Sequence, residues 1–279
     1  MKVSAKDIKK LRDQTGAGMM DCKKALQEAE GDFANAVQIL RKKGQKIMGK
    51  RADRNATEGV VVAITNAEGN KGVVVNLSAE TDFVSKNADF ISLAKEIADI
   101  AIREFPATKD ELNALSFNDK LTVGERTVGM AGVIGEKIEI KKYDRLEAAQ
   151  VAAYIHMGYK VGVLLSIDKA SEDLTAAGKN MAMQVAALSP IAVDKEDIPA
   201  DAVEKERVLQ LEMTRTAMPD KPEKMIQNIV NGKLNKLFFK EKTLMNQQYV
   251  KDSKSTVKEY LKSVDKEAKV LGFVRMDLA

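Results

Sequence analysis

The sequence predicts an α+β fold, and three patterns along its 279 residues lead to that prediction. Residues 4–44 carry apolar side chains at helical spacing, interrupted by glycines. Two later stretches, 59–104 and 151–186, each read as a strand, a turn, a returning strand and a helix. Residues 201–241 are helical throughout. Helices and antiparallel hairpins arranged in separate blocks are typical of α+β proteins.

The N-terminal residues 1–44 predict a module of three short helices. Ser4 is a candidate N-cap for the first helix, and Asp32 is one for the third. Gly44 is a good residue to end the third helix. Residues 45–57 then read as a basic, partly helical linker.

A tight glycine turn at residues 16–18 leads into the second helix of this module. Met19 and Met20 follow it, and because they are adjacent, one helix face cannot bury both equally. The pattern predicts one methionine in the core and the other at the surface, where a flexible thioether suits a partner. The alternative is that both belong to one small core.

Two diverged copies of a hairpin-plus-helix unit follow. Gly162 lies 90 residues after Gly72, each near the start of a returning strand, and each hairpin precedes a helix. Between the copies, the glycines from 124 to 135 read as turn glycines, and residues 137–141 alternate as a half-buried strand. The predicted segments are a first core subdomain (58–144), a second one (145–200 and 242–279) and an inserted antiparallel helical hairpin (201–241).

A polar turn after the first hairpin carries a large apolar residue. Thr81, Asp82, Phe83 and Val84 lie between the returning strand and the helix. One interpretation is a capping aspartate and a phenylalanine anchored in the core. The other is an exposed aromatic side chain on a rigid scaffold, which is what the anchor of an interface requires.

These segments together resemble bacterial elongation factor Ts. The N-terminal stretch TGAGMMDCKKAL (residues 15–26), then Gly-Asp at 31–32 and LRKKG at 40–44, is similar to the family's first signature. TDFV at 81–84 is similar to its second. The resemblance runs from about residue 4 to about residue 275, and it implies that residues 1–44 are UBA-like and that residues 201–241 form a coiled-coil hairpin.

The resemblance also implies a partner and the residues that contact it. In elongation factor Ts the Asp-Phe pair contacts the nucleotide domain of elongation factor Tu, and the phenylalanine inserts between two helices. Its insertion shifts those helices of the partner. The shift disturbs the partner's Mg²⁺ site and loosens its phosphate-binding loop. The positions of this sequence that match contact positions are Asp82 and Phe83 with Thr81 and Val84, and also Ile134, His156, Met19 and Met20.

Motifs for catalysis or for a bound cofactor are missing from the sequence. No phosphate-binding loop motif occurs. A single His and a single Cys cannot build a Cys/His metal site. We therefore expect no catalytic residues, no cofactor, no metal and no enzyme activity. The lone Cys22, the lack of an apolar signal segment and the lack of any long apolar run favour a cytoplasmic protein without a membrane span.

The sequence, read with this resemblance, predicts a nucleotide exchange factor for elongation factor Tu. It would bind the GDP form and the nucleotide-free form, and a homodimer within a 2:2 complex is compatible with it. The alternative is an RNA- or ribosome-associated protein that uses its basic linker and helical arm. Nearly balanced charge, with 45 basic and 41 acidic residues, and scarce aromatic residues count against direct nucleic-acid binding.

Overall fold

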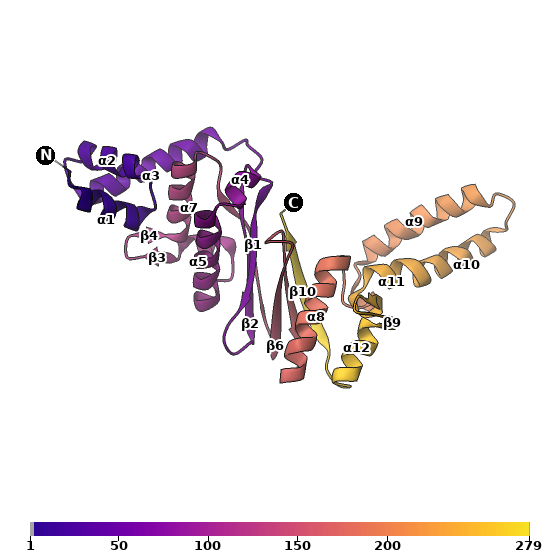
Figure 1. Cartoon of the computed structure of the whole chain (residues 1–279). Coiled ribbons are helices and arrows are strands. Elements are labelled where there is room, and N and C mark those ends of the chain that lie inside the picture. The colour runs from indigo at the N-terminus through magenta and orange to yellow at the C-terminus, as the bar shows by residue number, and fades with distance from the viewer. Residues whose placement is uncertain (1–2, 279) are drawn as a thin grey trace. The chain divides into compact units, whose positions relative to one another are not determined.

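The computed structural model describes residues 3–278, which divide into two compact units (Figure 1). Unit 1 runs to Arg145 and also includes Ile155–Gly162 and the residues from Met276 onward. Unit 2 comprises Leu146–Tyr154 and Val163–Arg275. The predicted α+β class is confirmed, with N-terminal helices followed by small antiparallel sheets.

Unit 1 begins with three helices: α1 (Ala5–Thr15), α2 (Met19–Glu28) and α3 (Phe33–Lys50). The side chains of Ser4 and Asp32 accept backbone N–H bonds at the starts of α1 and α3, so both predicted caps are confirmed. The prediction that α3 ends at Gly44 is wrong, because the helix continues for six more residues. The apolar face of α3 packs against α7 (Val123–Ile134), and this contact favours helix in α3 beyond Gly44.

The glycines predicted to form turns between the two copies lie mostly within α7. A Cβ at Gly132 would lie 3.2 Å from the Cα of Gly44, and a Cβ at Gly44 would lie 2.5 Å from the carbonyl oxygen of Val128. These glycines therefore let α3 and α7 approach closely, which outweighs their low helix propensity. Gly135 does form a turn, with φ of 82° at the C-terminus of α7.

The first sheet has the order β1-β2-β5, with β1 (Glu58–Thr65), β2 (Lys71–Ala79) and β5 (Glu139–Glu147). β1 and β2 form the predicted antiparallel hairpin. The elements between β2 and α7 are α4 (Asp82–Ser85), α5 (Ala88–Glu104), α6 (Lys109–Ala114), β3 (Ser116–Asn118) and β4 (Leu121–Thr122).

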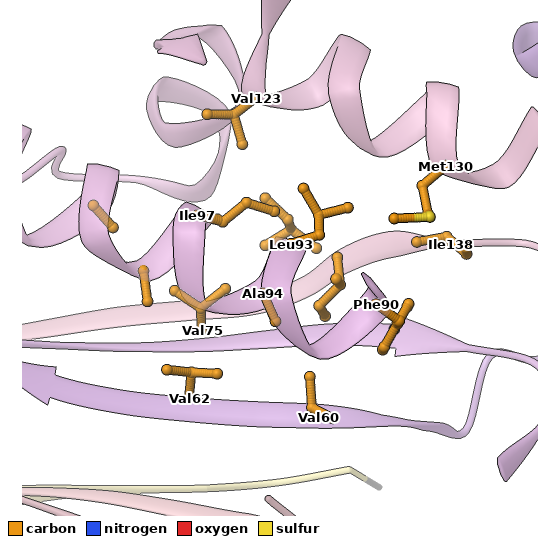
Figure 2. Close-up of a cluster of buried hydrophobic side chains, with 14 of the residues drawn as sticks. Val60, Val62, Val75, Phe90, Leu93, Ala94, Ile97, Val123, Met130 and Ile138 are labelled. Carbon is orange, nitrogen blue, oxygen red and sulfur yellow. The ribbon is translucent and has the colours of Figure 1, made fainter. Parts of the chain in front are cut away.

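The main core of unit 1 lies around α5. Figure 2 shows Phe90, Leu93 and Ile97 of α5 between the valines of β1 and β2 on one side and α7 on the other. All three side chains are fully buried. Burying a side chain of this size stabilises the fold by about 1.5–3 kcal/mol. The segment between β2 and α5 therefore starts and ends on a rigid base.

The second sheet has the order β10-β7-β6, with β6 (Gln150–His156), β7 (Val161–Ile167) and β10 (Val270–Asp277). The predicted second hairpin is confirmed, and β10 completes the sheet. The other elements of this copy are α8 (Glu172–Leu188), β8 (Gln248–Tyr249), β9 (Asp252–Thr256) and α12 (Val257–Val264).

The internal repeat is longer than the sequence pattern predicted. Both copies run hairpin, long helix, two-stranded ladder, capped helix and third strand. The capped helices α7 and α12 begin with the same capping box, formed by Thr122 with Glu125 and by Thr256 with Glu259. In each sheet the third strand lies beside the second strand of the hairpin.

An antiparallel helical hairpin is inserted in the second copy, as predicted (Figure 1). Its parts are a 3-10 turn (Lys195–Asp197), α9 (Ala200–Ala217), α10 (Glu223–Lys233), a π-helix (Leu234–Phe238), α11 (Phe239–Lys242) and a second 3-10 turn (Leu244–Asn246). The two ends of the insertion meet, because Ala192 forms a parallel bridge with Thr243 and Ile191 N–H donates to the carbonyl of Lys242. None of the helices in residues 3–278 is long and apolar enough to span a membrane.

Candidate functional site

The one-turn helix α4 presents Phe83 to solvent. Its side chain is 83% exposed, whereas the next residue, Val84, is buried against the core of unit 1. Successive residues of a helix point about 100° apart, so one turn is enough to bury one side chain and display the other. Of the two interpretations of this turn, the structure supports the exposed aromatic side chain and not the one anchored in the core.

Asp82 lies on the exposed side of the same turn. Its carboxylate accepts a hydrogen bond of 2.6 Å from the ammonium group of Lys86, four residues further on. This hydrogen bond and the positive charge of Lys86 lower the pKa of Asp82. The pair is exposed to water and contributes little to stability. Asp82 therefore keeps a negative charge next to Phe83.

Thr81 precedes α4 and is held by Glu136. The Thr81 hydroxyl donates to Glu136 Oε1 at 2.7 Å, and the N–H groups of Glu80 and Thr81 donate to Glu136 Oε2 at 3.2 and 3.1 Å. Glu136 follows Gly135, whose left-handed conformation redirects the chain at the end of α7. Because three donors bond to one carboxylate, the orientation of Thr81 relative to Glu136 is fixed.

Glu80 completes the attachment in the opposite direction. Its carboxylate accepts from the N–H of Lys137 at 2.6 Å and from the guanidinium of Arg51, at the C-terminal end of α3, at 2.7 and 2.8 Å. Burial acts to raise the pKa of Glu80, but these hydrogen bonds and the positive charge of Arg51 outweigh it and lower the pKa. Glu80 therefore remains ionised and ties three chain segments together.

Ile134 is the last residue of α7 and lies half-buried against the core. It also borders a hollow of about 370 Å³ in unit 1, together with Arg126 and the first residues of α5. The Arg126 guanidinium donates to the carbonyl of Thr15, and burial lowers its pKa. Ile134 thus combines contact with the core and partial exposure.

The sequence pattern predicts that His156 begins the turn of the second hairpin, but in the structure it is the last residue of β6. The turn follows as residues 157–160, and Met157, Gly158 and Tyr159 all have positive φ. The carbonyl of Tyr159 accepts from Val61 N–H of β1 at 2.7 Å. His156 is half-buried at the base of this turn in unit 1.

A comparison with protein families decides what kind of protein this is. The family model described as Elongation factor TS matches residues 80–279, beginning at the glutamate that binds Arg51. The chain belongs to the elongation factor Ts family. It is therefore grouped with the elongation factors of protein synthesis.

Similar proteins cover nearly the whole chain. Elongation factor Ts of Flavobacterium psychrophilum is 45% identical over 276 residues, which is 99% of this chain and 98% of that protein. The Amoebophilus asiaticus protein of the same name is 46% identical over 277 residues, with 99% of both chains covered. That of Porphyromonas gingivalis is 41% identical over 278 residues, covering 100% of this chain and 99% of the relative.

In this member of the elongation factor Ts family, both methionines of the first signature are exposed. Met19 is 50% and Met20 is 63% exposed, so the prediction that one of them lies in the core is wrong. The inward positions of α2 are taken by Cys22, Ala25 and Leu26. Burial raises the pKa of the Cys22 thiol, which packs as a small apolar group.

All eight predicted contact residues lie in unit 1. Residues 81–84 form a single turn, and the chain segment after Ile134 holds that turn, whereas His156 lies on β6 and the methionines on α2. Sequence reasoning missed Glu80 and Glu136. The signal that could have found Glu136 is an acidic residue directly after a helix-ending glycine. Residues 3–278 hold no group of three or more His, Cys, Asp or Glu suited to a metal ion.

Proposed function

We propose that this chain is the guanine nucleotide exchange factor of elongation factor Tu. Membership of the elongation factor Ts family supports this proposal, and it rests most directly on the exposure of Phe83 from a fixed turn. An aromatic side chain displayed on a rigid base can enter a gap between partner helices with little loss of conformational entropy. The chain acts in the cytoplasm as a binding protein and catalyses no chemical step.

Each contact residue has a distinct role in this proposal. Phe83 inserts between two helices of the partner's nucleotide domain, and Asp82 offers a charge beside it. Thr81 and Val84 hold the turn, since one is bonded to Glu136 and the other is buried. Additional contacts come from Ile134, His156, Met19 and Met20.

Exchange then follows from linked equilibria. Entry of Phe83 shifts the partner's helices, which disturbs the Mg²⁺ and phosphate sites, so GDP leaves and GTP replaces it. If the factor weakens GDP binding, GDP weakens binding of the factor by the same ratio. The factor needs no nucleotide site of its own.

The test is the release of fluorescent GDP from purified elongation factor Tu. The variant F83A is expected to slow factor-stimulated release by roughly tenfold, which corresponds to about 1.4 kcal/mol of lost stabilisation of the exchange transition state. Its melting temperature should stay unchanged. L271A, which truncates a 59% exposed leucine of β10, is the matched control and should exchange normally. Normal exchange by F83A would refute the proposal.

A further inference from the structure

Two chain segments of unit 1 are joined by reciprocal hydrogen bonds, which we call the carboxylate latch. The carboxylate of Glu136 accepts from the N–H groups of residues 80 and 81 and from the Thr81 hydroxyl. The carboxylate of Glu80 accepts in return from the N–H of Lys137. Each segment thus supplies both a carboxylate and backbone donors.

The latch determines how α4 begins. Thr81 is the N-cap residue of α4, yet its side chain makes no capping bond to that helix. Its hydroxyl donates to Glu136 instead, at 2.7 Å. The usual N-cap interaction, a threonine oxygen accepting from the first turn, is therefore replaced by a bond to another chain segment. The direction of α4 then depends on Glu136.

The two ends of the latch adjoin two predicted contact residues. Phe83 lies two residues after Thr81, and Ile134 lies two residues before Glu136. Arg51, bonded to Glu80, adds the end of α3 to the same cluster. One network of hydrogen bonds therefore fixes the spacing between the exposed aromatic side chain and the end of α7.

We propose that Glu136 is a positioning residue for nucleotide exchange, because it holds α4 in the direction that presents Phe83 together with Ile134. This inference rests on the proposed function. A residue that supports the fold in general would lower stability and affect every activity alike. Glu136 acts through Phe83, so its removal matters only while Phe83 is present.

The variant E136Q tests this role, since it preserves the shape of the side chain but removes its charge and one strong acceptor. Hydrogen exchange of the Glu80 and Thr81 amides in the free protein should accelerate about tenfold. Stimulated GDP release from elongation factor Tu should slow by about fivefold to tenfold, because charge-assisted hydrogen bonds are the stronger class. E139Q, three residues further on and half-exposed on β5, is the matched control and should change neither quantity.

A double-mutant cycle separates positioning from general support. Adding E136Q to F83A should slow GDP release no further than F83A alone. An equal slowing in both backgrounds, or unchanged exchange of the two amides, would overturn the role of Glu136. If F83A alone leaves GDP release unaffected, the proposed function fails, while amide exchange still reports on the latch by itself.

Discussion

Apart from the inserted helical hairpin, the two copies of the repeat differ in the segment between the β-hairpin and the long helix. In the first copy that segment is residues 80–87, and in the second it is residues 168–171. The long helices are of equal length, 17 residues each, and both end with a residue in the left-handed conformation. Four residues are therefore enough to connect these elements, and the first copy uses eight.

The additional residues contain α4 and Phe83. In the second copy, Ser171 caps α8 directly, and the Asp168 carboxylate accepts from the N–H of Lys269. In the first copy, Asn87 caps α5 in the same way, and the chain before it forms the displayed turn. The difference teaches that the scaffold needs only a cap at this position. In the proposed function, the longer turn and its latch serve to contact the partner.

The largest effect is expected when the first copy is given the short connection of the second copy. Replacing residues 80–87 by Asp-Lys-Ala-Ser keeps an N-cap for α5 but removes α4, Phe83 and the latch. Stimulated GDP release should fall at least about a hundredfold, equivalent to about 2.7 kcal/mol. Stopped-flow fluorescence measures the rate, and circular dichroism checks that the fold persists. An unreduced rate would show that the turn is not the site.

The second prediction contrasts two phenylalanines seven positions apart. Phe90 is fully buried in the core around α5, whereas Phe83 is displayed. F90A should lower the free energy of unfolding by about 3–5 kcal/mol. F83A should change it by less than about 0.5 kcal/mol, as expected for a surface substitution. Urea denaturation measures both, and a large loss for F83A would mean that the turn supports the fold.

The third prediction concerns the contact between α3 and α7. Of the two capped helices, only α7 contains glycines, and they let α3 approach closely. Gly44 faces α7 in close contact, so G44A should destabilise the protein by about 1–3 kcal/mol through overpacking. Gly49, on the same helix α3, has no neighbour within 4 Å of a Cβ built there. G49A should instead stabilise by about 0.5–1 kcal/mol. Thermal melts of both variants check the pair, and equal effects would contradict the close approach of α3 to α7.

The smallest expected effect is on the pKa of Glu80, which the latch lowers. A carboxylate with a lowered pKa stabilises the fold above its unfolded value of about 4.3, and that contribution is lost as pH falls through the folded value. R51M should raise the Glu80 pKa toward its ordinary value. NMR titration of the carboxyl carbon measures it, with R103M, which breaks an exposed pair with Glu104, as control. No shift in R51M would mean that Arg51 does not hold Glu80.

Features set by local pattern were predictable from the sequence. The two hairpins, the helix at 88–104 and the caps at Ser4 and Asp32 follow from alternation and capping over a few residues, whereas local pattern left the burial of Phe83 open. The same reasoning failed at Gly44 and in α7, where contacts between distant helices override glycine's local preference.

At the candidate site, the turn at residues 81–84 could be predicted, but the carboxylates of Glu80 and Glu136 that hold it could not. Nothing local indicates that Glu136 bonds to Thr81, because the two are 55 positions apart in sequence. The extended repeat did leave a local signal, since Thr-Val-x-Glu occurs at 122–125 and again at 256–259. In the sequence, the inserted helical hairpin separates the second Thr-Val-x-Glu from the long helix of its own copy, which hides the extended repeat.

The parallel bridge between Ala192 and Thr243 has a consequence for engineering. The chain leaves and re-enters the second copy at adjacent points, so the residues between Ala192 and Thr243 form a closed loop. Closing a loop over such a short gap costs little conformational entropy, and that cost grows only slowly with the length of the loop. Residues 194–242 could therefore be replaced by a short linker, or by another folded domain, while the strands of the surrounding repeat keep their register.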